Sequence, residues 1–216
     1  MSAIPTTKGR ILGVLGGASV NPSVLAAWVN SATLVAAADS GADALLAAGV
    51  TPDIVVGDLD SLVADRRIFS DVREDLSEAS TDCDKLLAVL AAEGHTSVTL
   101  INVAGDLPDH ELAILHSAAN SDLFCRLVFN RGFGHVLVGP ARHAFDGHGR
   151  VSILPLTHCT GVTVAGVRWP LRHADLDALG RTSISNEAVA PVIEVSLDSG
   201  AVFLFTESAI SPSWPQ

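Results

Sequence analysis

The sequence predicts an α/β protein in which a parallel-sheet domain, residues 1–129, precedes an antiparallel β domain, residues 130–216. Up to residue 129, short apolar runs alternate with helix-length amphipathic segments, which is the pattern of parallel strands joined by crossover helices. After that point short β-rich runs follow one another, separated by glycine, proline and asparagine. Because 48% of the 216 residues are hydrophobic and only 17% are charged, we expect a well-buried core rather than disorder.

The elements of the first domain follow from apolar periodicity and from residues that start or stop helices. Strands are expected at 11–15, 33–38, 53–56, 97–103 and 123–129. Helices are expected from Asn21 and Pro22, which fit a cap and a first-turn proline, and at 42–48, 82–92 and 109–119.

In the second domain, strands are expected at 136–138, 151–155, 161–167, 192–197 and 201–205. The tripeptide Asp198-Ser199-Gly200 separates the last two runs and is typical of a tight turn. We therefore expect these two strands to form a hairpin.

The charge of the chain is concentrated in the first domain. The formal net charge is −11, and residues 1–125 hold 17 of the 24 acidic residues but only 6 of the 13 basic ones. This balance disfavours binding to nucleic acid or to an anionic membrane surface. Twelve of the acids lie between Asp39 and Asp84, which suggests a cation or a cationic ligand, although a solvated acidic face is the commoner explanation of such a run.

The cysteines and the hydropathy of the chain indicate in which cellular compartment it is expected. Cys83, Cys125 and Cys159 are odd in number, widely spaced and without a C-x-x-C pair, so neither a disulfide framework nor a zinc site is predicted. No segment approaches the roughly 18 apolar residues of a membrane span. A reducing, cytoplasmic location is expected.

Acidic residues stand where the predicted parallel strands end. Asp39 follows the second strand, Asp58 and Asp60 follow the third, and Asp82 and Asp109 open the helices on either side of the fourth. Ligands of open parallel sheets bind beyond the carboxyl ends of the strands, and paired carboxylates suit a hard divalent ion such as magnesium with a nucleotide. Taken singly, each of these acids also fits an ordinary helix cap or a first-turn acid.

Other chemical motifs are weaker. The sequence has no G-x-G-x-x-G, no G-x-x-x-x-G-K-[ST], no G-x-S-x-G and no H-E-x-x-H. His110 is a candidate general base, but a structural or positioning role is the favoured interpretation. Trp169 is compatible with a buried core position and with a ring that stacks on a flat heterocycle.

Six short segments occur in an order typical of one known family. They are Ala38-Asp39-Ser40-Gly41-Ala42, residues 52–61 with Gly57-Asp58-Leu59-Asp60-Ser61, Thr81-Asp82 with Asp84-Lys85, Asp109-His110 with Leu112-Ala113, residues 161–171 with Trp169-Pro170-Leu171, and Ser185-Asn186-Glu187. In this order they resemble the motifs of thiamine pyrophosphokinases, and the resemblance spans nearly the whole chain.

The resemblance implies a Rossmann-like three-layer domain, a C-terminal β-sandwich, a homodimer with active sites between subunits, and transfer of diphosphate from ATP to thiamine with release of AMP. By position, the resemblance implies these roles: Asp58, Asp60 and Asp82 as catalytic residues and Mg²⁺ ligands, Asp109 as a catalytic residue at the metal or the attacking hydroxyl, Asp39, Gly41 and Lys85 as ATP-binding residues, and Trp169, Ser185 and Asn186 as thiamine-binding residues.

Three positions depart from the family pattern. Leu107 stands where the family usually has arginine, Ala79 where it tends to have an acid, and Ser40 where it has glycine. Lys85, Arg131 or an arginine of the other subunit would have to replace the lost phosphate partner. The sequence therefore leaves two alternatives open: a catalytically impaired relative that binds thiamine or a nucleotide, and a pyrophosphokinase for another hydroxymethyl heterocycle such as a pterin.

Overall fold

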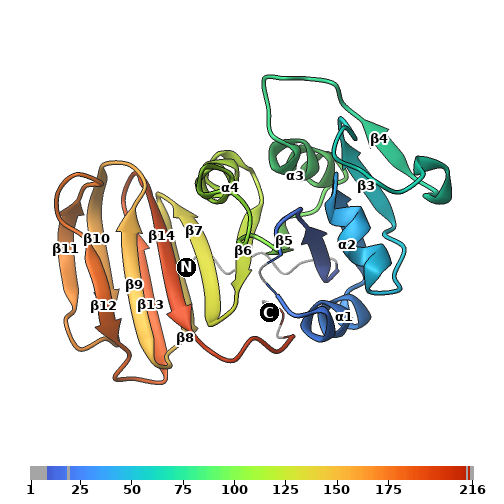
Figure 1. The fold of residues 1–216 in the computed structure, drawn as a ribbon. Helices are drawn as coiled ribbons and strands as arrows, with labels where there is room; N and C mark the ends of the chain where they lie inside the picture. The colour runs from blue at the N-terminus through green and yellow to red at the C-terminus, as the bar shows by residue number, and fades with distance from the viewer. Residues whose placement is uncertain (1–8, 19, 213, 215–216) are drawn as a thin grey trace. The chain divides into compact units, whose positions relative to one another are not determined.

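The chain divides between Asn130 and Arg131 into two units (Figure 1). The structure is a computed structural model that describes residues 9–18, 20–212 and 214. Residues 9–130, together with the described residues from 210 onward, form an α/β unit, and residues 131–209 form a β-rich unit.

The α/β unit is built on a parallel sheet with the strand order β6-β5-β1-β2-β3-β4. Its strands are β1 (Ile11–Val14), β2 (Leu34–Ala38), β3 (Ile54–Gly57), β4 (Val72–Glu74), β5 (Ser97–Ile101) and β6 (Phe124–Phe129). Its helices are α1 (Pro22–Ser31), α2 (Gly41–Ala47), the short 3-10 helix η1 (Arg66–Ile68), α3 (Asp82–Ala92) and α4 (Pro108–Asn120).

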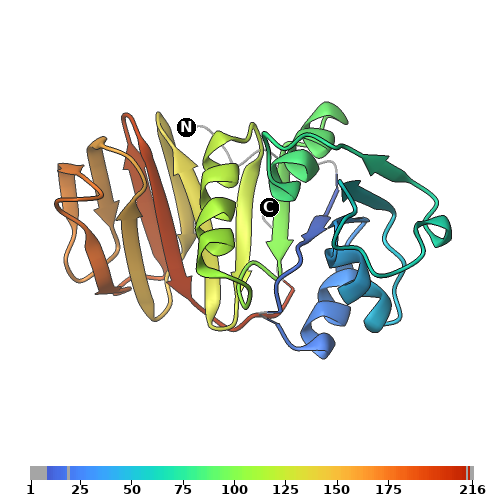
Figure 2. The ribbon, with the colours of Figure 1, turned by 45° about the horizontal axis from the view of Figure 1, so that its top comes forward.

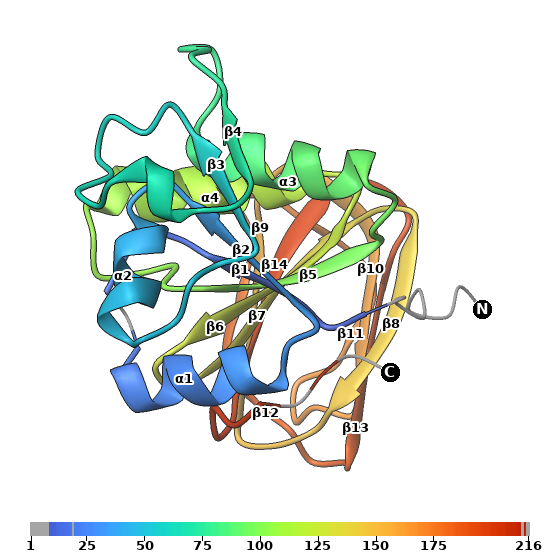
Figure 3. The ribbon, with the colours of Figure 1, turned by 90° about the vertical axis from the view of Figure 1, so that its right-hand side faces the viewer.

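The helices cover both faces of this sheet, with α1 and α2 on one face and α3 and α4 on the other (Figure 3). The chain runs from β1 through β2 and β3 to β4 and then returns to place β5 beside β1. Because right-handed crossovers in opposite directions put their helices on opposite faces, this reversal produces three layers. It also places a switch point, where ligands bind in open α/β sheets, at the carboxyl ends of β1 and β5.

Local signals in the sequence explain where the helices begin. The Asn21 side chain accepts a hydrogen bond from the Ser23 N–H at 2.9 Å, and Pro22 occupies the first turn of α1. Thr81 and Asp84 form a reciprocal capping box at the start of α3. Each cap satisfies backbone N–H groups that have no acceptor inside the helix.

The described C-terminal residue packs on the α/β unit. The ring of Trp214 meets the fully buried Trp28 edge to face, with centroids 5.2 Å apart, and its Nε1 donates to Ser31 Oγ at 3.1 Å. The end of the chain therefore lies with the first unit, whereas the sequence places it in the second.

The β-rich unit is a sandwich of two antiparallel sheets, coloured from yellow to red in Figures 1 and 2. One sheet has the order β12-β9-β14-β7 and the other β11-β10-β13-β8. The strands are β7 (Gly132–Val138), β8 (Ala141–Asp146), β9 (Arg150–Pro155), β10 (Cys159–Ala165), β11 (Leu171–Leu176), β12 (Ser183–Glu187), β13 (Val192–Leu197) and β14 (Ala201–Glu207). His135 of β7 and Phe145 of β8 meet across the sandwich with ring centroids 4.6 Å apart.

The predicted hairpin of the last two strands is wrong. β13 pairs with β8 and β10, whereas β14 pairs with β7 and β9, so the turn at 198–200 carries the chain from one sheet to the other. Both strands point apolar side chains inward, for example Val195 and Leu204, and two such faces are buried best when the strands face each other across the core.

Four strands were not predicted, namely β4, β8, β11 and β12. In β8, exposed side chains alternate with partly covered ones, so the segment carries little apolar signal. The predicted fold class, an α/β domain followed by a β-sandwich, is confirmed. Among the described residues, the helices are too short or too polar to cross a membrane.

Candidate active site

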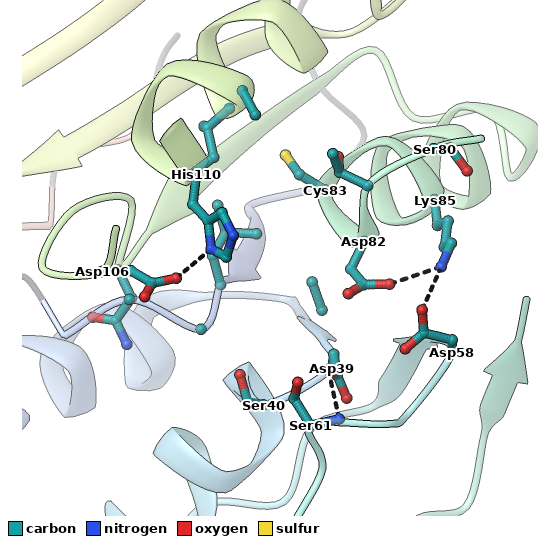
Figure 4. A pocket seen from close by; sticks show the side chains of 18 of the residues that line it. Asp39, Ser40, Asp58, Ser61, Ser80, Asp82, Cys83, Lys85, Asp106 and His110 are labelled. Carbon is teal, nitrogen blue, oxygen red and sulfur yellow. Dashed lines mark hydrogen bonds and ion pairs between the residues drawn. The ribbon is translucent and has the colours of Figure 1, made fainter. Parts of the chain in front are cut away.

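Three carboxylates meet at the carboxyl end of the parallel sheet (Figure 4). Asp39 follows β2, Asp58 follows β3, and Asp82 is the first residue of α3. Each offers an oxygen, and these oxygens all lie within 4.8 Å of one another. The arrangement arises because β2 and β3 are neighbours and α3 packs against both of them.

Gly57 leaves the space in which these side chains meet. Its φ is +150°, and a Cβ atom there would lie 3.1 Å from Asp82 Oδ1 and 3.2 Å from the Cβ of Asp39. A larger residue would combine an unfavourable backbone conformation with crowding of two carboxyl-bearing side chains.

Gly41, a predicted ATP-binding residue, serves a packing role. A Cβ atom there would come within 2.2 Å of the Val14 carbonyl oxygen, so glycine allows the start of α2 to lie against the end of β1. The side chain of the preceding residue, Ser40, lines the adjoining cleft.

Lys85 neutralises part of the carboxylate cluster. Its side chain is 2% exposed, and Nζ donates to Asp82 Oδ1 at 3.0 Å and to Asp58 Oδ2 at 3.2 Å. Burial opposes the charge, but the hydrogen bonds to the two carboxylates outweigh it and raise the pKa of Lys85. Hydrogen bonds from the Asp60 N–H and then from Lys85 lower the pKa of Asp58.

Asp39 is the member of the cluster that forms no ion pair with Lys85. Its Oδ2 accepts from the Ser61 N–H at 3.3 Å, while its buried Oδ1 has no hydrogen-bond partner among the described residues. Burial, and then the charge of Asp82, raises the pKa of Asp39. A carboxylate oxygen in this position is expected to need a cation when it is charged.

Asp60 lies beside the cluster of three rather than in it. Its Oδ1 accepts from Ser61 Oγ at 3.0 Å, and its backbone N–H donates to Asp58 Oδ1 at 3.2 Å. The residue between them, Leu59, adopts φ +65°, and Asp60 is not one of the three carboxylates that meet within 4.8 Å. The family resemblance implies Asp60 as a ligand, whereas the third member of the group in the structure is Asp39.

The cluster opens into a cleft of about 510 Å³. The cleft is also lined by Gly16 and Gly17 after β1, by the segment before α3 that includes Ser77 and Glu78, by Asn102 after β5, and by the first turns of α4. The volume suits a small-molecule substrate. The position matches the switch point between β1 and β5.

Helix α4 presents His110 to the cleft, and not Asp109. Asp109 is exposed and is not among the residues that line the cleft, whereas Asp106, His110 and Ile114 line it. His110 and Ile114 are four residues apart and therefore share one side of α4, while Asp106 lies in the loop before the helix. Leu107, where the family usually has arginine, is 57% exposed and also lies outside the lining.

The predicted thiamine-binding residues lie in the β-rich unit. Asn186 is buried, and its amide accepts from the Trp169 N–H at 3.1 Å and donates to the Trp169 carbonyl at 2.8 Å. Asn186 therefore holds the backbone of Trp169, a residue that is 59% exposed. Ser185 adopts φ +60°, and its N–H donates to Ser152 Oγ at 3.0 Å.

Two of the candidates for a replacement phosphate partner, Lys85 and Arg131, are already engaged. Lys85 binds two carboxylates, and Arg131 forms an ion pair with Glu207 in the β-rich unit. Sequence reasoning missed Asn102 and Asp106 as lining residues. Asn102 lies at the carboxyl end of the strand expected at 97–103, and Asp106 precedes His110 by four residues, so the sequence placed both near a predicted strand end or helix start.

Comparisons with known proteins agree with this architecture. Residues 25–128 match the family model for the thiamin pyrophosphokinase catalytic domain, and residues 142–202 match the model for the thiamin pyrophosphokinase vitamin B1 binding domain. A search of curated protein sequences found no match.

Several solved structures share the fold. The thiamine pyrophosphokinase of Bacillus subtilis has a TM-score of 0.76 at 19% identity, covering 92% of this chain and 99% of that one. The Candida albicans enzyme has a TM-score of 0.74 at 14% identity, with 92% and 89% covered. The yeast enzyme has a TM-score of 0.72 at 13% identity, with 96% and 89% covered.

Proposed function

The chain belongs to the thiamin pyrophosphokinase family, and on this premise we propose that it transfers a diphosphate group from ATP to the hydroxyl of thiamine. The products are thiamine diphosphate and AMP. The observation that carries the proposal is the cluster of Asp39, Asp58 and Asp82 in a cleft at the carboxyl end of the parallel sheet.

The cluster fits a magnesium ion in its donor chemistry. Carboxylate oxygens are the ligands that Mg²⁺ prefers, and the buried Oδ1 of Asp39 has no other partner among the described residues. We propose that Asp39, Asp58 and Asp82 hold the ion, with Asp60 beside them. When bound, Mg²⁺ would neutralise phosphate charge and polarise the phosphate oxygens.

The proposed step needs positioning more than covalent chemistry by the protein. The thiamine hydroxyl oxygen bonds to the β-phosphorus of ATP, and the bond from that phosphorus to the oxygen bridging it to the α-phosphorus breaks. AMP leaves with the bridging oxygen, and the hydroxyl proton is released. Lys85 holds the carboxylates of Asp58 and Asp82 in place for this step through its two hydrogen bonds.

The exposed ring of Trp169 supports a thiamine site in the β-rich unit. Thiamine carries a positive thiazolium, and a tryptophan face attracts such a cation by about 0.5–2 kcal/mol. The Asn186 amide holds the Trp169 backbone on both its N–H and its carbonyl, so the ring is presented from a braced position. We propose that Asn186 acts on thiamine through Trp169.

A turnover assay tests the function. Purified protein, ATP, Mg²⁺ and thiamine are expected to yield thiamine diphosphate and AMP, and chelation of the metal is expected to stop the reaction. Saturable binding of ATP or thiamine without products would instead identify the impaired binding relative. Faster reaction with a hydroxymethyl pterin in direct competition would identify the other alternative.

We also propose a homodimer in the cytoplasm. The β-rich unit carries apolar side chains that are more than half exposed, among them Trp169, Ile184 and Val189, and a subunit interface would cover groups of this kind. Cys83, Cys125 and Cys159 are free and buried, which suits a reducing compartment. Sedimentation that gives a monomer at micromolar protein would contradict the dimer.

A further inference from the structure

We propose that His110, oriented by Asp106, is the cationic residue of the cleft that binds the phosphates of the nucleotide. The inference rests on the proposed function, because it concerns how the same cleft holds ATP. It adds a phosphate-binding residue to the carboxylates that hold the metal.

The charges around the cleft create the need for such a residue. Seven of its lining residues are acidic, and Lys85 is the one lysine or arginine among the described lining residues. The Lys85 ammonium already contacts Asp58 and Asp82 at 3.2 and 3.0 Å. A nucleoside triphosphate keeps negative charge even after it binds a divalent ion, so it needs a further cation to enter a cleft whose charged residues are mainly carboxylates.

His110 has the geometry for this role. Its Nδ1 lies 2.6 Å from Asp106 Oδ2, which fixes the ring and leaves Nε2 for a ligand. Figure 4 shows His110 on one side of the hollow and Asp58 with Lys85 on the other. An anion between them would therefore meet the imidazole from one side and the metal-holding carboxylates from the other.

The loop that carries Asp106 is itself held in place. Glu111, the residue after His110, accepts a hydrogen bond from the Gly105 N–H at 2.8 Å. Two successive residues of α4 thus bind two successive residues of the loop, which orients the imidazole. An exposed ion pair of this kind contributes little to stability, so its value lies in placing the ring.

The Asp106 contact favours a cation over a neutral base. The hydrogen bond to Asp106, and then its charge and that of Asp109, raise the pKa of His110. In the charged ring, Nδ1–H donates to Asp106 and Nε2–H is free to donate to a phosphate oxygen. Charge-assisted hydrogen bonds to phosphate are among the stronger polar contacts in proteins.

Substitutions of His110 distinguish a cation that binds phosphate from a base that accepts a proton. We expect His110→Ala to raise the KM for ATP roughly 10-fold, as the loss of a charged hydrogen bond does, and to leave the KM for thiamine unchanged. The KM for ATP of His110→Arg should stay within about 3-fold of the wild-type value, because arginine restores a cation that donates to phosphate. The KM for ATP of His110→Gln should lie between those of the Ala and Arg variants. Asp106→Asn should also raise the KM for ATP, because the imidazole ring loses the hydrogen bond that orients it.

His116 provides the matched control. It is exposed on the same helix and outside the lining, so His116→Ala should leave both KM values and the melting temperature unchanged. If His110→Ala behaves like this control while the wild type turns over, the inference fails and the proposed function stands. If His110→Arg loses kcat as fully as His110→Ala with KM for ATP unchanged, the residue is a base and the inference is overturned. A wild type that neither binds ATP nor turns over would contradict the proposed function instead.

Discussion

Lys85 lies one turn after Asp82 on helix α3, and its buried ammonium donates to Asp82 Oδ1 at 3.0 Å while also reaching Asp58 at 3.2 Å. One lysine thus joins the start of α3 to the end of β3. It also holds together two carboxylates that would otherwise repel each other and the nearby Asp39.

Lys85→Met should destabilise the metal-free protein. The change leaves three adjacent carboxylates without their internal cation, and we expect a loss of about 1–3 kcal/mol, less than for a fully buried pair because Asp58 and Asp82 are about one-third exposed. Mg²⁺ should then raise the melting temperature of the variant more than that of the wild type. Thermal melts with Mg²⁺ and with chelator measure this, and equal shifts would contradict it.

Asp39→Asn should stabilise the metal-free protein and abolish metal binding. The pKa of Asp39 is raised in the folded state, so its charged form opposes folding above its ordinary pKa near 3.8, and the penalty disappears as the pH falls below that value. The variant should therefore melt at or above the wild-type temperature at pH 7 in chelator, with the difference vanishing in acid. A variant that melts lower at pH 7 would show that the Asp39 charge is compensated in the free protein.

The aspartates should differ in their catalytic importance. Asp58→Asn is expected to lower kcat by about 100-fold or more, because it removes a member of the cluster that is proposed to hold the ion. Asp60→Asn should cost less, since Asp60 lines the cleft beside the cluster, and Asp109→Asn should cost least. Steady-state kinetics with melting temperatures as the folding control give the order. A larger loss for Asp109→Asn than for Asp60→Asn would restore the catalytic role that the family resemblance implies for Asp109.

Asn186→Ala should weaken the thiamine site through Trp169. The change leaves the Trp169 N–H and carbonyl without the amide, which we expect to cost about 2–3 kcal/mol of stability and to raise the KM for thiamine. Trp169→Ala, at an exposed ring, should raise the same KM with little change in melting temperature. The KM for ATP should stay constant in both variants, and a matching rise in it would point to general unfolding.

Much of the fold followed from local chemistry. Apolar runs at 11–15 and 53–56 and the cap at Asn21 predicted elements that the structure contains, because they depend on neighbours along the chain. The prediction of a hairpin at 198–200 was wrong because strand pairing depends on residues far apart in the sequence. The tripeptide permits a tight turn, but β13 pairs with β8 and β14 pairs with β7, in different sheets. Strand β8 gave little apolar signal because its covered positions are only partly buried and Phe145 is the one large apolar side chain among them.

The sequence alone determined that acids stand at the ends of parallel strands, and the order of its motifs identified the family. Only the tertiary structure decided which acids meet. Asp39 joins Asp58 and Asp82 because β2 and β3 are adjacent and α3 packs over them. The phase of α4 likewise turned His110 toward the cleft and Asp109 to solvent. Side-chain direction depends on strand order and helix rotation, which arise from packing over the whole unit and not from spacing along the chain.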